Sequence, residues 1–175
     1  PPAATALTPG TVHAWQLSSG KTHSLGTGPS AGLFGFGFYW YTEASSPTKS
    51  SDGSLPVYEL AFDASVASEC RAGGGVESIS FSFHMYGSAI GELKVVGSDG
   101  ATRWRRSGNQ NDAWRASGDV AIGSSRFAFV HTKASSGIWY QADAAVADAE
   151  QMRRIDVTHP PIAAVGPATP SAITV

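Results

Sequence analysis

The sequence contains little cysteine and little charge. Cys70 is the single cysteine among 175 residues, so no disulfide can form within the chain, and a zinc site made of cysteines is excluded. It is interpreted either as a free thiol or as one half of a disulfide to a partner chain. Charged residues make up 15% of the sequence and leave a net charge of −2. Because nucleic-acid binding needs concentrated positive charge, this composition argues against a nucleic-acid partner.

Long apolar runs are missing as well. No stretch approaches the roughly 20 apolar residues of a membrane-spanning helix, so no direct membrane span is predicted. The five histidines show neither His-x-His nor His-x-x-x-His spacing, which leaves no metal site based on a histidine pair.

Short aromatic and β-branched segments separated by glycine-rich turns are present instead. Hydrophobic and polar or small side chains alternate with period two, as in half-buried antiparallel strands, over residues 34–41, 57–62, 79–86 and 92–96. Further strands are expected over residues 102–106, 120–122, 126–131 and 142–149, although residues 144–154 could also form a helix. Many short strands of this kind predict an all-β fold, an antiparallel β-sandwich of jelly-roll type.

The segment FSFHMYGSAIGELKVV (81–96) contains the most suggestive polar residues. It is interpreted as a hairpin whose turn uses Gly87 and Gly91. His84 shares one face of the first strand with Ser82. Because residues two apart on a strand have Cβ atoms about 7 Å apart, the pair is too distant for nucleophile activation. His84 is therefore expected to be structural or at the surface, and the chain is not expected to be an enzyme.

The two ends differ from the middle. Residues 1–11 are predicted to be an N-terminal extended segment, and residues 12–158 the folded domain. Residues 159–175 contain four prolines among small apolar residues, which predicts an extended tail. The tail is either without a partner or an arm that lies across one. The chain begins with Pro1, which suggests a processed or truncated chain.

Several stretches together resemble the MAM domain, the module named for meprins, the A5 antigen and receptor tyrosine phosphatase mu. They are GKTHSLGTGPSAG (20–32), GFYWYTEASSP (37–47), ISFSFHMYGSAIGELKVV (79–96), RWRRSGNQNDAW (103–114) and ADAAVADA (142–149). They occur in the family's order and span about residues 12 to 149. The pattern His-Met-Tyr-Gly-x-x-x-Gly-x-Leu-x-Val is the most specific of them.

The resemblance implies a jelly-roll sandwich in an extracellular or cell-surface setting, with a non-catalytic role in adhesion or assembly. Its partners would be other protein subunits or further copies of the chain, with the C-terminal tail as one candidate contact. Some members hold a calcium-like cation with carboxylates, and Glu43, Asp143 and Asp148 are the matching oxygen donors here. The chain departs from the family by lacking its two disulfides, with Ser78 where one cysteine usually stands.

Aromatic residues near turns give an alternative function. Trp139 and Tyr140 follow a glycine turn, and Trp114 and Arg115 follow another turn-rich segment. Stacking of such side chains on sugar rings would make the domain a carbohydrate-binding module. In the segment Arg103-Trp104-Arg105-Arg106, the tryptophan is expected in the core and the arginines in solvent.

Overall fold

The computed structural model describes residues 12–44, 53–66, 74–134 and 142–146. In chain order, the elements are β1 Val12–Ala14, β2 Gln16–Ser18, β3 Tyr39–Tyr41, β4 Val57–Asp63, the short 3-10 helix η1 Ala64–Val66, β5 Val76–Ile79, β6 Ser82–Met85, β7 Glu92–Gly97, β8 Thr102–Ser107, β9 Arg115–Ala116, β10 Val120–Ser124, β11 Arg126–Thr132 and β12 Ala144–Val146. The predicted all-β class is confirmed. The predicted extended ends, residues 1–11 and 159–175, lie outside the described residues.

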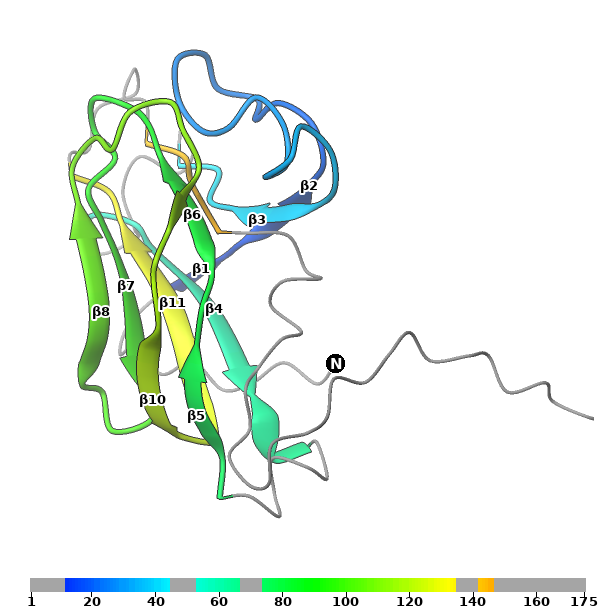
Figure 1. The fold of residues 1–175 in the computed structure, drawn as a ribbon. Coiled ribbons are helices and arrows are strands. Elements are labelled where there is room, and N and C mark those ends of the chain that lie inside the picture. Colours follow the sequence, from blue (N-terminus) through cyan, green and yellow to red (C-terminus); the bar gives the residue numbers. More distant parts are fainter. Residues whose placement is uncertain (1–11, 45–52, 67–73, 135–141, 147–175) are drawn as a thin grey trace, which may run out of the picture.

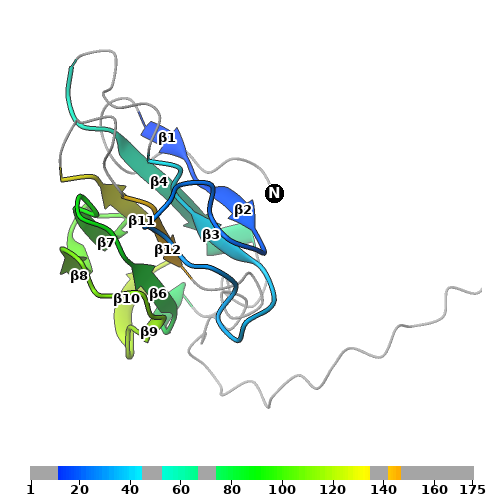
Figure 2. The same ribbon diagram turned by 90° about the horizontal axis from the view of Figure 1, so that it is seen from above.

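The strands form two five-stranded sheets that face each other. The first has the order β1-β4-β11-β7-β8 and the second the order β2-β3-β12-β6-β9. Seen from above, they form two layers, and the chain repeatedly crosses from one to the other (Figure 2). This is the sandwich that the strand pattern predicts. Pairing within the sheets is antiparallel except between β1 and β4, which run parallel.

The main core lies between the two sheets and follows the period-two pattern. On β7, Leu93 and Val95 are fully buried, and on β11 Phe127 and Phe129 point to the same interior. Phe81 contacts Phe129 edge to face, with ring centroids 4.7 Å apart, which joins the two layers. Burial of these apolar side chains is the main stabilising contribution to the fold.

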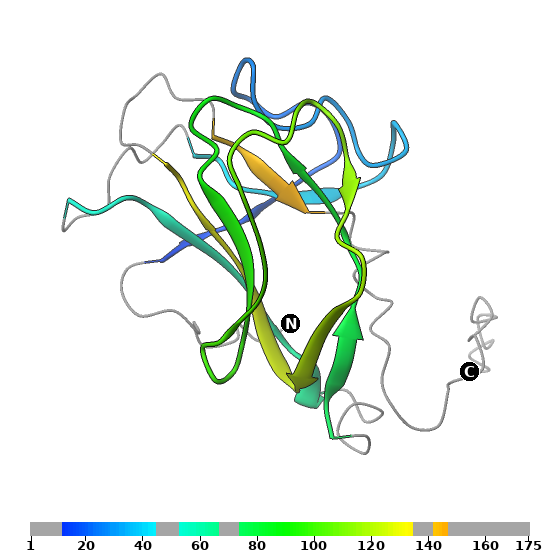
Figure 3. The ribbon, with the colours of Figure 1, turned by 60° about the vertical axis from the view of Figure 1, so that its left-hand side comes forward.

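The strand predicted over residues 79–86 is interrupted. β5 ends at Ile79 and β6 begins at Ser82, and a two-stranded β5–β10 ribbon extends beyond the second sheet (Figures 1 and 3). At the interruption, the Ser117 N–H donates to the Phe81 carbonyl at 2.8 Å. The predicted inward positions are correct, since Ile79, Phe81, Phe83 and Met85 are all buried.

The predicted hairpin at residues 81–96 is wrong. β6 pairs with β12 and β9, whereas β7 pairs with β11 and β8, so the two strands belong to different sheets. The glycines between them carry the chain across the end of the sandwich. Gly91 has φ +69°, and a β-carbon there would lie 1.9 Å from the Thr132 carbonyl oxygen. The glycines predicted to form a hairpin turn therefore lie in a connection between the two sheets. The local sequence cannot distinguish such a connection from a hairpin.

The strand predicted over residues 34–41 is also mostly wrong. Only Tyr39, Trp40 and Tyr41 form β3, and the preceding residues belong to a long β2–β3 loop. Gly35 and Gly37 have φ values of +81° and +85°, which are left-handed and incompatible with an extended strand. Three phenylalanines that would have faced the core are exposed instead.

Within the described residues, no helix is long and apolar enough to cross a membrane.

Candidate functional site

The clearest surface feature is a group of exposed phenylalanines in residues 32–38, here called the phenylalanine loop. Phe34, Phe36 and Phe38 are 64%, 71% and 55% exposed. The rings of Phe34 and Phe36 lie side by side, with centroids 6.3 Å apart and planes tilted by 42°. Large apolar side chains gathered at one place on a surface mark interaction sites more often than isolated ones do.

The phenylalanine loop has a defined shape. The Gly35 N–H donates to the Gly32 carbonyl at 2.9 Å, which closes a turn. A β-carbon on Gly32 would lie 2.2 Å from the Phe36 carbonyl oxygen, so the backbone folds back tightly on itself there. The Trp114 indole N–H donates to the Ala31 carbonyl at 3.1 Å and fastens the loop to the segment before β9. The phenylalanines are thus presented from a braced turn.

The β2–β3 loop also covers the outer side of β3 (Figure 1). Tyr39 and Tyr41 are buried there, beneath this loop and beside Trp114. The Tyr39 hydroxyl donates to the Gly20 carbonyl, and the ring centroids of Tyr39 and Trp114 are 5.7 Å apart. These contacts attach the base of the phenylalanine loop to the second sheet.

A pocket of about 210 Å³ lies next to the phenylalanine loop. It is lined by residues of the loop together with Ser30, His84, Asp112 and Trp114. His84 Nε2–H donates to Asp112 Oδ1 at 3.1 Å, while Nδ1 is buried without a hydrogen-bond partner. Burial lowers the pKa of His84, an effect that Asp112 partly offsets. The imidazole is therefore neutral at pH 7.

Ser30, His84 and Asp112 have the residue types of a hydrolytic triad, and residues 28–32 (Gly-Pro-Ser-Ala-Gly) have the spacing of a nucleophile elbow. The geometry does not support that chemistry. One His84 nitrogen bonds Asp112 and the other has no partner, so neither nitrogen contacts the Ser30 hydroxyl. The serine also lies in a strand-to-strand loop, not at a strand-to-helix turn. His84 itself is 2% exposed.

A second polar group is buried around Asp143, which is fully buried just before β12. Its Oδ1 accepts from the Ala44 N–H at 3.1 Å, and Oδ2 is buried without a hydrogen-bond partner. Burial, followed by the negative charge of Glu43, raises the pKa of Asp143 to about 6. Lys133 is also buried, and its Nζ donates to the Ala44 carbonyl at 2.5 Å. Burial lowers the pKa of Lys133, and the charges of Asp143 and Glu43 act in the opposite direction.

The carboxylates predicted as cation ligands only partly come together. Glu43 and Asp143 interact, but Asp148 lies outside the described residues. Calcium needs six to eight oxygen ligands, and the described ranges contain no group of three His, Cys, Asp or Glu residues placed to hold a metal. Moreover, the Lys133 ammonium interacts with both carboxylates. These residues alone do not fit a calcium ion.

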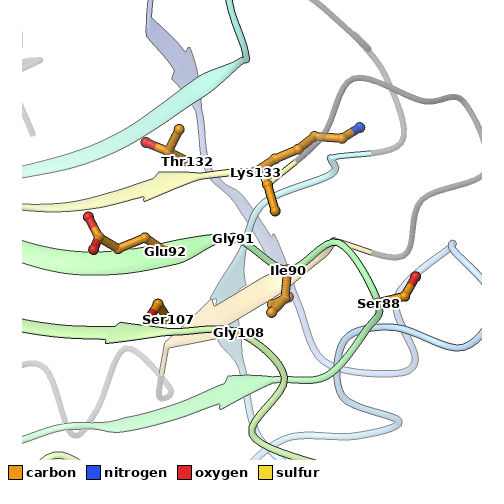
Figure 4. Close-up of a pocket in the computed structure, with 9 residues that line it drawn as sticks. Ser88, Ile90, Gly91, Glu92, Ser107, Gly108, Thr132 and Lys133 are labelled. Atoms are coloured by element: carbon orange, nitrogen blue, oxygen red, sulfur yellow. The ribbon is translucent and has the colours of Figure 1, made fainter.

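A larger pocket, of about 470 Å³, lies where the ends of β7, β8 and β11 meet. Figure 4 shows Glu92, Thr132 and Ser107 around it, while the Lys133 ammonium points away from Glu92. No acid–base pair or cluster of charges converges among its described lining residues. We assign no chemistry to it.

The remaining predicted site residues have separate outcomes. Trp114 is half-buried and its N–H is already bonded, and Arg115 is exposed at β9 with Nε donating to the Gln110 carbonyl at 2.8 Å. Trp104 packs against the core while its flanking arginines are exposed, as predicted. Three further candidates, Trp139, Tyr140 and Cys70, lie outside the described residues.

Sequence reasoning missed the phenylalanine loop and the Ser30–His84–Asp112 pocket. The glycines at positions 32, 35 and 37 were the available indication, because a strand with glycine at alternate positions has few side chains to bury on that face. For the pocket, the Gly-x-Ser-x-Gly pattern at residues 28–32 was a local signal that sequence reasoning overlooked, whereas the approach of His84 and Asp112 to that segment could not be read from spacing along the chain.

Comparison with known proteins gives a limited relationship. No family model matches the chain. An alignment 106 residues long, which covers 57% of this chain, shows 30% identity to MAM domain-containing protein 2 of the mouse, Mus musculus. The matched region covers 14% of that protein, so the two are compared over a small part of the relative. Together with the all-β sandwich, this similarity indicates a distant MAM-like relationship.

Proposed function

We propose that this chain is a non-catalytic interaction module of MAM type that takes part in an extracellular or cell-surface assembly. The observation that carries the proposal is the phenylalanine loop: three exposed aromatic side chains on a turn braced by Trp114. Exposed apolar side chains gain stability when a partner removes them from water. A preshaped loop loses little conformational entropy on binding, which favours recognition by shape. The similarity to a mouse MAM domain-containing protein supports the extracellular setting.

Light scattering after size exclusion tests this proposal over a range of protein concentrations. Two chains are measured, the full chain and a chain ending at Thr158. Each is compared with its own variant that carries Phe34→Ser, Phe36→Ser and Phe38→Ser together. We expect self-association in at least one unsubstituted chain and its loss in the substituted one. The control replaces Leu17 and Val66, which are also exposed, by serine and should leave the mass unchanged. Monomers throughout would contradict assembly through this surface.

The pocket beside the phenylalanine loop favours carbohydrate binding as the second candidate. A pocket of about 210 Å³ beside an indole and an exposed carboxylate offers an aromatic wall and a hydrogen-bond acceptor for a single sugar unit. Retention on polysaccharide columns, with release by free sugar, would identify it. Asp112→Asn should weaken the retention, whereas Asp99→Asn, at an exposed turn elsewhere, should not. If neither chain is retained, this second function is contradicted.

A test of the non-catalytic assignment uses a fluorophosphonate, which labels activated serines. We expect no labelling of Ser30, because its hydroxyl is not bonded to His84. Labelling that disappears in Ser30→Ala would show that the pocket rearranges into a working triad, and would overturn the assignment.

A further inference from the structure

We propose that the uncharged, proline-rich segment 159–175 of the same chain docks on the phenylalanine loop. This inference rests on the proposed function, since it names the first occupant of the same surface.

The path of the chain brings the segment to this place. β12 lies between β3 and β6, with Ala145 opposite Tyr41 and Val146 opposite Trp40 (Figure 3). Because β12 and β3 are antiparallel, the chain leaves β12 beside the end of β3 that follows Phe38. The C-terminal part of the chain thus starts its course next to the phenylalanine loop.

The two surfaces match in chemistry. Residues 31–38 contain no charged side chain, and residues 159–175 contain no Asp, Glu, Lys or Arg. Four prolines in the segment favour an extended conformation, which docks between aromatic rings with little loss of conformational entropy. The tilted pair Phe34 and Phe36, with centroids 6.3 Å apart, offers two ring faces side by side.

The covalent connection favours the chain's own segment over that of another molecule. Residues 147–158 form a connection of twelve residues, which spans at most about 40 Å at ~3.3 Å per residue. A short connection of this kind produces an effective concentration in the millimolar range. A contact too weak to hold two separate chains together would therefore still be occupied within one chain.

Paramagnetic relaxation in the full chain tests the proposal. A nitroxide is attached at Ala164→Cys in a Cys70→Ser background, and the chain is labelled with nitrogen-15. We expect several-fold weaker amide signals for Phe34, Phe36 and Phe38 than with a diamagnetic label. The matched control carries Phe34→Ser, Phe36→Ser and Phe38→Ser with the same nitroxide and should recover the loop signals.

Each other result has a definite meaning. Unchanged loop signals would overturn the docking. A mixing experiment separates contact within one chain from contact between two chains: chains that carry the nitroxide but no nitrogen-15 are mixed with nitrogen-15 chains that carry no nitroxide. If the loop signals are still weakened in this mixture, the contact comes from a second copy and the same-chain version is overturned. Loss of docking leaves the proposed function intact if the chain still associates in light scattering. Docking without any association would instead support the inference and contradict the assembly role.

Discussion

Gly32 and Phe36 are in such close contact that position 32 has no room for a β-carbon: one built there would lie 2.2 Å from the Phe36 carbonyl oxygen. Gly32→Ala should therefore force the phenylalanine loop open and reduce the free energy of unfolding by about 1–3 kcal/mol. Urea denaturation followed by tryptophan fluorescence measures this loss. Gly20→Ala is the matched control, because nothing lies within 4 Å of a β-carbon at that glycine in the same long loop. Equal stability of the two variants would contradict the tight turn.

Trp114 fastens the phenylalanine loop through one hydrogen bond to Ala31. Trp114→Phe removes the N–H donor and keeps an aromatic ring beside Tyr39, so the free energy of unfolding should fall by about 1 kcal/mol. Amide hydrogen exchange should accelerate within residues 31–37 and stay unchanged in β11. Accelerated exchange throughout the sandwich would mean that Trp114 supports the whole fold and not the loop alone.

The buried carboxyl of Asp143 should make the protein less stable as the pH rises. Its pKa is about 6 in the folded chain against an ordinary 3.8, so between these values the folded state binds more protons than the unfolded state. Stability from this group is greatest below about pH 4 and decreases through pH 6, by at most ~3 kcal/mol at 1.36 kcal/mol per pKa unit. In urea titrations between pH 4 and 6, the free energy of unfolding of Asp143→Asn should therefore rise more with pH than that of the unaltered protein.

Asp99→Asn is the control for that experiment. The hydrogen bond from the Ala101 N–H lowers the pKa of the exposed Asp99, so its effect on stability has the opposite sign. The same pH dependence in Asp143→Asn as in the unaltered protein would contradict the assigned titration of Asp143.

His131 should produce the opposite pH dependence in the same range. It is fully buried between Thr42 and the Ile90 carbonyl, and burial lowers its pKa to about 4 from 6.5. The folded state therefore binds fewer protons, and stability is lost as the pH falls from about 6.5 towards 4. In the unaltered protein the effects of Asp143 and His131 partly offset each other. In His131→Gln, stability should fall more steeply with rising pH than in the unaltered protein, and an unchanged profile in that variant would contradict the offset between these two groups.

Parts of this fold that depend on local side-chain alternation could be predicted. β4 and β7 lie in the first sheet beside β11, and their inward side chains are the ones that period two indicates. The hairpin at residues 81–96 failed because alternation and glycine turns do not specify which strand pairs with which. Only the register of β6 with β12, roughly sixty residues later, shows that the chain changes sheets.

The candidate site was predicted least well. In residues 34–38 the phenylalanine–glycine alternation imitates a strand, and left-handed glycines override it. His84 was placed on the outer face of its strand, which is correct, yet it is buried because Trp114 and Asp112 from a distant segment reach it. A contact between remote segments thus decided the burial of His84, whereas the local backbone conformation of Gly35 and Gly37 decided the shape of residues 34–38.

The central place of β12 has a consequence for biosynthesis. Residues 144–146 fill the gap between β3 and β6, although they are the last of the described residues. A ribosome must therefore release nearly the entire domain before its second sheet can close. Until then, β3 and β6 would each expose an unpaired edge, which is a hazard for aggregation. Messages truncated before the codon for Ala144 should yield insoluble protein, and a holdase chaperone should bind the nascent chain until this short strand emerges.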